Sequence, residues 1–208
     1  MYSSITAGVA GTGFIGPVHV EALRRLGVRV KGISSATLEI AEEARQQLNL
    51  EHAYPSFEAM LEDDELDVIH LAVPNVLHYP MVKRVLAAGK HVMCEKPLAM
   101  TSEQGEELVK LAAATNLKAG VNYNLRFYPM NLEVKDRLAK GDARVFSVVG
   151  GYQQDWLLYD TDYNWRVLAD QGGALRAVSD IGTHWLDLLH FTTGLEVEAV
   201  LADLTLSL

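Results

Sequence analysis

The sequence predicts an α/β protein whose N-terminal part is a doubly wound parallel sheet. Three observations lead to this fold class. Short apolar runs alternate with stretches of helical periodicity over residues 5–122. A glycine-rich turn separates the first apolar run from the first helical stretch. The helical stretches are long enough for the right-handed crossovers that join parallel strands.

The first two strand–helix pairs follow from apolar alternation and helix-forming composition. Residues 5–10 are apolar and predict a strand, and residues 17–26 carry leucines at helical spacing after Pro17, which suits a helix start. Residues 28–34 alternate apolar with smaller or polar side chains and predict a second strand. Residues 38–48 are rich in Glu, Ala, Arg and Gln and predict a second helix.

The next strands and helices extend the same alternation. Residues 67–73 predict a buried strand, and residues 80–88 predict a helix that begins at a proline and stops at a glycine. Residues 91–94 predict another short strand. A further helix opens at Thr101, and Gln104 completes a capping box.

The pattern changes after residue 124, which divides the chain into two expected domains, residues 1–124 and residues 125–208. The second part contains, in order, a helix over residues 129–140, a strand over 143–152, a polar and aromatic loop over 153–170, a helix over 173–191 and a strand over 197–208.

Composition excludes several classes of partner. Lys and Arg total 18 against 27 Asp and Glu, a net charge of −9 without a basic stripe, so we expect no nucleic acid. The single cysteine, Cys94, favours a reducing, cytoplasmic location. No apolar run reaches membrane-spanning length, and Arg24 is the first Lys or Arg, so we expect neither a membrane segment nor a signal peptide. Residues 62–67 are mostly acidic and could hold a metal or form a docking patch, but a solvated loop is the favoured interpretation.

The glycine-rich turn has the spacing G-x-G-x-x-G. The glycines Gly11, Gly13 and Gly16 enclose Phe14 and Ile15, with a strand expected before them and a helix after them. This context favours a Rossmann dinucleotide site over an ordinary Gly-rich turn, because the glycines admit a diphosphate to the helix N-terminus.

The end of the second strand departs from the usual dinucleotide pattern. An acidic residue is expected there to bind the adenosine ribose, but Ser34 and Ser35 occupy the position. Neither a carboxylate nor a neighbouring Arg or Lys is present in residues 36–38. The choice between NAD and NADP therefore stays open.

Four motifs together resemble those of one known family. They are Gly11–Gly16, Pro74 and Asn75 with His78, Glu95-Lys96-Pro97, and Asp180 to His184 followed by Asp187. In order and separation they are similar to the glucose-fructose oxidoreductase and inositol dehydrogenase family, often abbreviated Gfo/Idh/MocA. The resemblance runs along essentially the whole chain.

The resemblance implies a second domain of the α+β class with a mostly antiparallel sheet. Only residues 143–152 and 197–208 offer strands for it, and two strands make a marginal sheet. We therefore expect the substrate domain to be truncated, and the full-length protein to be a homo-oligomer. The residues that the resemblance places near the cofactor are Pro74, Asn75, His78, Glu95, Lys96 and Asn124.

The resemblance also assigns the catalytic roles. Lys96 contacts the reacting hydroxyl, His184 removes its proton and Asp180 orients the substrate. On a regular helix Asp180, His184 and Asp187 share one face, at spacing i, i+4, i+7. The alternatives are that Lys96 is an ordinary surface lysine and that His184 with its two neighbouring carboxylates forms a structural polar network. Lys96-Pro97 is a candidate cis bond.

Further residues lie where the resemblance expects substrate contacts. Arg126, Trp165 and Arg166 are the candidates, although Trp165 could be a core residue and Arg126 could bridge the domains. His19 is interpreted as a packing or solvent residue, and the histidines do not form a metal site by spacing.

These inferences predict an NAD(P)-dependent dehydrogenase that acts on a hydroxyl-bearing carbon of a sugar or polyol such as an inositol. Two alternatives remain: a redox-neutral NAD-dependent glycosidase, and a dinucleotide-binding sensor without turnover. The sequence does not identify the sugar or polyol.

Overall fold

The computed structural model describes residues 2–141, 143–153, 155, 157–159 and 161–204, which group into two compact units. The first unit comprises the described residues up to Asn122 together with Asp155–Asp180. The second comprises those from Tyr123 to 153 and those from Ile181 onward. The change of unit at Tyr123 lies beside the expected boundary at residues 124 and 125. Residues 155–180, however, group with the first unit.

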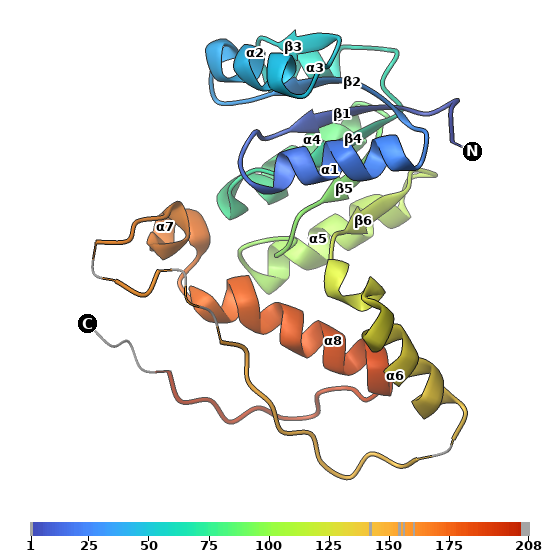
Figure 1. Cartoon of the computed structure of the whole chain (residues 1–208), viewed down its shortest axis with the longest axis vertical. Coiled ribbons are helices and arrows are strands. Elements are labelled where there is room, and N and C mark those ends of the chain that lie inside the picture. Colours follow the sequence, from blue (N-terminus) through green and yellow to red (C-terminus); the bar gives the residue numbers. More distant parts are fainter. Residues whose placement is uncertain (1, 142, 154, 156, 160, 205–208) are drawn as a thin grey trace. The chain divides into compact units, whose positions relative to one another are not determined.

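The first unit is built on a six-stranded parallel sheet in the order β3-β2-β1-β4-β5-β6 (Figure 1). This order confirms the expected doubly wound sheet, because β1 lies between β2 and β4 and the connections reverse direction there. The sequence predicted neither of the three-residue strands β3 and β6. The strands are β1 (Thr6–Ala10), β2 (Arg29–Ser34), β3 (His52–Tyr54), β4 (Val68–Leu71), β5 (His91–Cys94) and β6 (Ala119–Val121).

Helices on this unit begin at polar caps in several cases. Thr101 Oγ1 accepts a hydrogen bond from Gln104 N at 3.3 Å, and Gln104 Oε1 accepts from Met100 N at 3.1 Å. The expected capping box is therefore present, with the reciprocal bond displaced by one residue. The helices are α1 (Ile15–Arg25), α2 (Leu38–Gln47), α3 (Phe57–Leu61), α4 (Asn75–Ala87), α5 (Ser102–Ala113) and α7 (Ala169–Gly172), with a 3-10 turn η2 (Trp165–Val167).

Helix α4 corrects one expectation. It begins at Asn75, so Pro80 lies inside the helix rather than at its start. A proline there removes one helical hydrogen bond. The helix continues through it because the residues beyond, including Met81, Val82 and Val85, are buried in the core.

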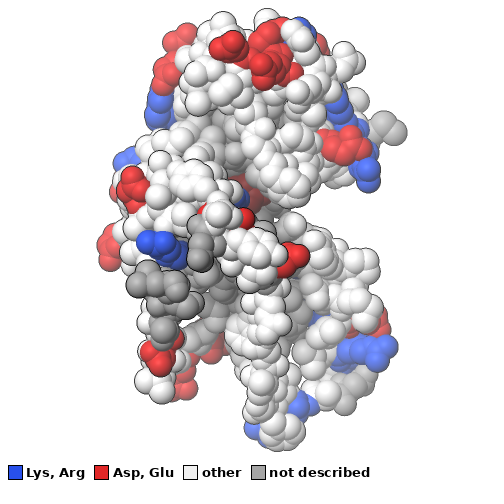
Figure 2. Space-filling model, turned by 60° about the vertical axis from the view of Figure 1, so that its left-hand side comes forward, with Lys and Arg blue, Asp and Glu red and all other residues white. Residues whose placement is uncertain are grey.

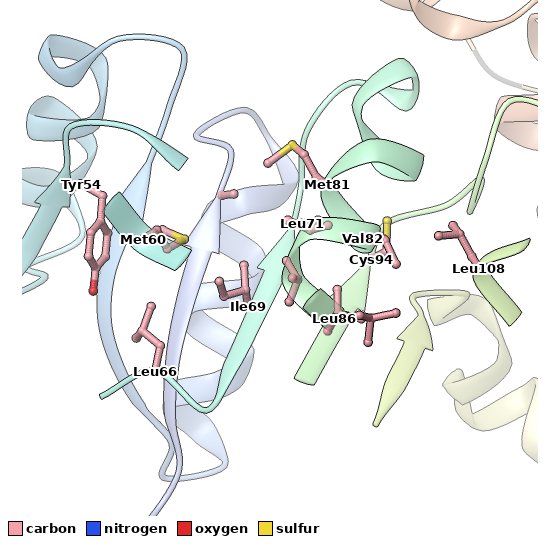
Figure 3. Packing of buried hydrophobic residues seen from close by; sticks show 13 residues of the cluster. Tyr54, Met60, Leu66, Ile69, Leu71, Met81, Val82, Leu86, Cys94 and Leu108 are labelled. Atoms are coloured by element: carbon pink, nitrogen blue, oxygen red, sulfur yellow. The ribbon is translucent and has the colours of Figure 1, made fainter. Parts of the chain in front are cut away.

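Two hydrophobic clusters cover the two faces of the sheet, because successive strand residues point to opposite sides. Ile69 and Leu71 of β4 join a cluster with residues of α3, α4 and α5, part of which is shown in Figure 3. Val68 packs against the other cluster, which includes Val20 of α1. His70 alternates with Ile69 and Leu71 and therefore faces the α1 side.

The acidic run before β4 is more than a solvated loop, which corrects the sequence-based interpretation. Asp63 forms an ion pair with Lys31 Nζ at 2.6 Å and accepts a hydrogen bond from Tyr54 Oη at 2.5 Å. Glu65 contacts Lys31 at 3.1 Å and Arg29 at 2.9 Å. Lys31 is a buried lysine, and a buried ammonium needs such partners. The run therefore supplies countercharges at the amino edge of the sheet.

The regular secondary structure in the described residues of the second unit is helical. Helix α6 (Pro129–Ala139) confirms the expected helix and packs against α8 (Thr183–Thr193). A 3-10 turn, η1 (Asn124–Phe127), precedes α6. The described residues include no helix that is both long and apolar enough to cross a membrane.

Neither of the two strands expected in the second unit is formed in the described residues. Residues 143–153 and 197–204 are irregular, and residues 205–208 lie outside the described part of the chain. A strand needs a neighbour for its backbone hydrogen bonds and its side chains. Phe146 and Val149 are 86% and 94% exposed, so they lack the packing that would support a strand.

Charged side chains of both signs lie among one another on the face shown in Figure 2, without a basic stripe on that face. Acidic and basic side chains are thus not separated into an acidic and a basic half on this face.

The Asp63 contacts predict a specific acid sensitivity. Burial by itself raises the pKa of Asp63, but its bonds to Lys31, Tyr54 and the Glu65 amide outweigh burial and lower it from 3.8 to about 2. The unfolded chain therefore takes up this proton first as pH falls. The stabilisation is complete above about pH 4 and is lost between about pH 4 and pH 2. Urea unfolding across this range should show a shallower pH dependence in Asp63→Asn.

The matched control for this prediction is Asp64→Asn, because Asp64 is an exposed neighbour in the same loop. Its unfolding midpoint should follow that of the parent protein. Parallel curves for the parent and Asp63→Asn would contradict the assigned role of Asp63.

Candidate active site

The glycine-rich turn between β1 and α1 is required by close backbone packing. Gly11 has φ of +109°, and a Cβ at this position would lie 2.1 Å from the carbonyl oxygen of Ala72. A Cβ on Gly16 would lie 2.1 Å from the carbonyl oxygen of Gly11. At these two positions the packing of the backbone itself allows only glycine, independently of any ligand.

Gly13 differs from the other two glycines. A Cβ added to Gly13 would meet no protein atom within 4 Å. Phe14 is 90% exposed and provides no side-chain cap, and α1 begins at Ile15 without an acidic residue in its first turn. An open glycine in front of uncapped helix amides is a suitable cradle for an anionic diphosphate.

The two serines after β2 have different environments. Ser34 is 3% exposed, and its Oγ is directed at Met60 Sδ, 3.9 Å away in the core. Ser35 Oγ lies 2.8 Å from Thr12 Oγ1 within the glycine-rich turn. Of the two, Ser35 is therefore the side chain beside the candidate dinucleotide site.

The motif at the start of α4 is buried against backbone. Pro74 is the N-cap, and Asn75 Nδ2 donates to Gly172 O at 3.0 Å. His78 is fully buried, with Nδ1 2.6 Å from Pro97 O and Nε2 2.9 Å from Val73 O. Burial lowers the pKa of His78, against the opposing effect of these two carbonyls. The motif ties the end of β4 to the loop after β5, while its expected cofactor contact stays a prediction.

Lys96 and Asp180 form an ion pair within the first unit. Lys96 follows β5, and its Nζ donates to Asp180 Oδ1 at 2.6 Å and to Asp180 O at 2.8 Å. Both side chains are nearly buried, with 12% and 10% exposure. Arg166 Nε lies 3.4 Å from Asp180 Oδ2. The structure therefore brings together three of the expected site residues, and the Lys96-Pro97 bond is cis as expected.

The helix expected to present Asp180, His184 and Asp187 on one face is not regular. Val178–Gly182 forms a π-helical turn, η3, and α8 begins at Thr183. His184 and Asp187 keep their i, i+3 spacing within α8, whereas Asp180 lies in the π-turn, whose hydrogen bonds span five residues. The shared face of all three residues therefore stays a prediction.

His184 and Arg126 have contacts within the second unit. His184 is 8% exposed at the start of α8, and its ring meets Tyr123 edge-on at 5.8 Å. Arg126 Nε donates to Asp187 Oδ2 at 2.7 Å, and its guanidinium lies 5.2 Å from the Phe191 ring centroid. Arg126 therefore has a structural partner within this unit, and its expected role with substrate stays a prediction.

The two remaining candidate residues, Asn124 and Trp165, lie in different 3-10 turns. Asn124 is exposed in η1. Trp165 belongs to η2 in the first unit, where its ring lies 4.4 Å from the Arg166 guanidinium carbon. Neither the cofactor contact of Asn124 nor the substrate contact of Trp165 is tested by these positions.

The sequence did not reveal a buried hydrogen-bonded network around Glu95, the residue that precedes Lys96. Glu95 accepts hydrogen bonds from His19 at 2.9 Å and from Asn122 at 2.6 Å, and His19 also contacts His70 at 2.8 Å. His19 is 6% exposed, so its interpretation as a packing residue omits its polar contacts. A signal was available, since His70 interrupts an apolar strand and Glu95 follows another.

Within the described residues no cluster of three or more His, Cys, Asp or Glu side chains has the arrangement of a metal site.

Comparison with known proteins identifies the family. Residues 5–123 match the group described as "Oxidoreductase family, NAD-binding Rossmann fold", and residues 132–207 match the Gfo/Idh/MocA C-terminal domain. The chain belongs to the Gfo/Idh/MocA oxidoreductase family, as the motifs indicated.

Several relatives are named for sugar chemistry. Levoglucosan dehydrogenase of Pseudarthrobacter phenanthrenivorans is 31% identical over 97% of this chain and 54% of its own length. The 1,5-anhydro-D-fructose reductase of Ensifer adhaerens is 30% identical over 83% of this chain and 51% of its own. A solved levoglucosan dehydrogenase in complex with NADH and levoglucosan is 29% identical, with a TM-score of 0.85 over 91% of this chain and 54% of its own. The chain thus spans about half the length of these relatives.

The open position of Gly13 predicts a variant that separates binding from folding. Gly13→Val should fold, because a Cβ at this position meets no protein atom within 4 Å, yet it should fill the space in front of the α1 amides. NADH affinity, measured by nicotinamide fluorescence, should fall at least about tenfold, or about 1.4 kcal/mol.

Gly105→Val is the matched control, because a Cβ at Gly105 also meets nothing within 4 Å. It should bind NADH like the parent protein. Undiminished binding by Gly13→Val would remove this turn as the dinucleotide site.

Proposed function

We propose that this protein is an NAD(P)-dependent oxidoreductase that transfers a hydride between nicotinamide and a hydroxyl-bearing carbon of a sugar or polyol. The observation that carries the proposal is the Lys96–Asp180 pair, with Nζ and Oδ1 2.6 Å apart after β5 of the Rossmann sheet. The carboxyl edge of such a sheet is where ligands bind in doubly wound folds.

The glycine-rich turn supports the cofactor part of the proposal. Gly11 and Gly16 permit the tight turn, and Gly13 leaves its outer side open in front of α1. When bound, a nicotinamide dinucleotide supplies the hydride chemistry. The relatives named for NADH complexes and sugar substrates support the same assignment.

Lys96 is assigned to the reacting hydroxyl. Two of its three ammonium hydrogens have acceptors in the Asp180 carboxylate and carbonyl, which fixes the direction of the amine. The third can be donated to a hydroxyl or carbonyl oxygen of the substrate. Asp180 thereby orients Lys96, and a preorganised donor stabilises negative charge that develops on that oxygen.

His184 is assigned to the transfer of the hydroxyl proton. Its residue type suits this role near neutral pH, and it is buried beside Tyr123 at the start of α8. The family resemblance gives the same role to this position.

The catalytic assignment predicts large kinetic effects. Lys96→Ala and His184→Ala should each lower the rate of hydride transfer by about 10²-fold or more, the usual scale for acid–base groups. NADH affinity should change little. Single-turnover absorbance changes with levoglucosan, 1,5-anhydro-D-fructose and a panel of polyols measure the rate directly.

Lys110→Ala is the control, because this lysine is 78% exposed on α5. It should turn over at the parent rate. Parent rates in both Lys96→Ala and His184→Ala would overturn the assignment. Product formed without net change of NADH absorbance would instead favour the redox-neutral glycosidase.

Cofactor preference is assigned to Ser35, the uncharged side chain next to Thr12. Ser35→Asp should shift the ratio of the two affinities toward NAD by about tenfold or more, since a carboxylate binds ribose hydroxyls and repels a ribose phosphate. Fluorescence titration with NADH and NADPH measures the ratio. Ser34→Ala is the control, because Ser34 faces the core. An unchanged ratio in Ser35→Asp would show that the adenosine ribose lies elsewhere.

A further inference from the structure

Four polar side chains from separate parts of the first unit form a hydrogen-bonded cluster beside the backbone of Lys96. His19 comes from α1, His70 from β4, Glu95 from the end of β5 and Asn122 from the end of β6. His19 and Glu95 are 6% and 8% exposed. Four polar groups gathered inside a protein cost desolvation unless each finds a partner, so the cluster needs a physical explanation.

The Glu95 carboxylate is the centre of this cluster. Its Oε1 accepts from His19 Nε2 at 2.9 Å and from Asn122 Nδ2 at 2.6 Å. Its Oε2 accepts from the backbone N–H of Lys96 at 3.3 Å. Burial by itself raises the pKa of Glu95, but the His19 and Asn122 bonds outweigh it and lower the pKa, so the carboxylate is ionised. One ionised group is therefore held at both oxygens.

The proton arrangement around His19 follows from these partners. A carboxylate only accepts, so His19 Nε2 must carry hydrogen. The two Nδ1 atoms of His19 and His70 lie 2.8 Å apart, which requires one hydrogen between them. Burial, with a smaller effect from His19, lowers the pKa of His70 to about 4, so His70 is neutral near pH 7. His70 thereby completes the hydrogen bonding of His19 and orients its ring toward Glu95.

We propose that His19 is a positioning residue for Lys96. By holding the Glu95 carboxylate, it fixes the peptide between Glu95 and Lys96 and hence the direction in which Lys96 leaves the sheet toward Asp180. Its role in turnover rests on the proposed function, whereas its effect on the Lys96 backbone does not.

The position of His19 on α1 gives this arrangement a second consequence. His19 lies one turn beyond Ile15, the first residue of the helix whose N-terminus faces the candidate diphosphate site. The same side chain therefore connects the dinucleotide-binding helix to the loop that carries Lys96. Apolar side chains of similar volume would fill the space without this connection, which is why polar residues are explained by positioning rather than by packing alone.

Two substitutions at His19 separate its two hydrogen bonds. The terminal amide of Gln reaches the place of His Nε2, so His19→Gln retains a donor for Glu95 and loses the link to His70. The shorter Asn reaches the place of Nδ1, so His19→Asn retains a partner for His70 and loses the donor for Glu95. The exposed His52 on β3 provides the control substitution His52→Asn.

The first readout is independent of activity. In amide NMR spectra of the protein, the Lys96 N–H resonance should move in His19→Asn and stay near its parent position in His19→Gln and His52→Asn. Asn122→Asp, which places a second carboxylate beside Glu95, should move it as well. This variant provides the test if His19→Asn does not fold.

The second readout is kinetic. His19→Asn should lower kcat by about tenfold or more, since a displaced reacting group can cost up to about 10²-fold, while NADH affinity stays within about threefold. His19→Gln should restore kcat to within about threefold of the parent. This rescue distinguishes the bond to Glu95 from mere filling of space.

The two readouts fail in different ways. An unmoved Lys96 resonance in both His19→Asn and Asn122→Asp would overturn the positioning role, whatever the activity. Equal loss of kcat in His19→Gln and His19→Asn would also overturn it, because the Glu95 bond would not be the determinant. If the parent protein oxidises no sugar or polyol, the proposed function fails, and the Lys96 resonance still decides the positioning inference.

Discussion

The parallel direction of the six strands is the constraint on which the candidate site depends. In a parallel sheet every strand ends at the same edge, so segments far apart in the sequence emerge together. The glycine-rich turn leaves β1, Lys96 follows β5 and Asn122 follows β6 at this edge. Because β1 lies between β2 and β4, the connections diverge beside the glycine-rich turn and leave its outer side open.

A buried or nearly buried lysine is paired with carboxylates at each edge of the sheet, but the two arrangements differ. At the amino edge, the buried Lys31 is neutralised by Asp63 and Glu65 of the loop before β4. At the carboxyl edge, the Lys96–Asp180 pair leaves one ammonium hydrogen for another acceptor, and the ionised Glu95 is held behind it. The first arrangement ties the loop before β4 to β2, whereas the second presents a donor in a defined direction at the edge where ligands bind in such folds.

Local sequence features predicted much of the fold because they depend on nearest neighbours. Apolar alternation identified the longer strands, and Thr101 with Gln104 identified a helix start. The three-residue β3 was too short for such a pattern. Pro80 was misleading because the burial of α4 outweighs its local preference, and residues 143–152 were misleading because strand formation requires a partner.

The sequence by itself determined the family, the parallel sheet and the residue types of the site, because motif spacing and periodicity are properties of the chain alone. Only the tertiary structure decided which of these residues touch. It paired Lys96 with Asp180, turned Ser34 into the core and Ser35 toward Thr12, and joined His19 to Glu95. The physical reason is that these contacts join residues up to 84 positions apart, whose approach depends on sheet order and strand alternation rather than on local sequence.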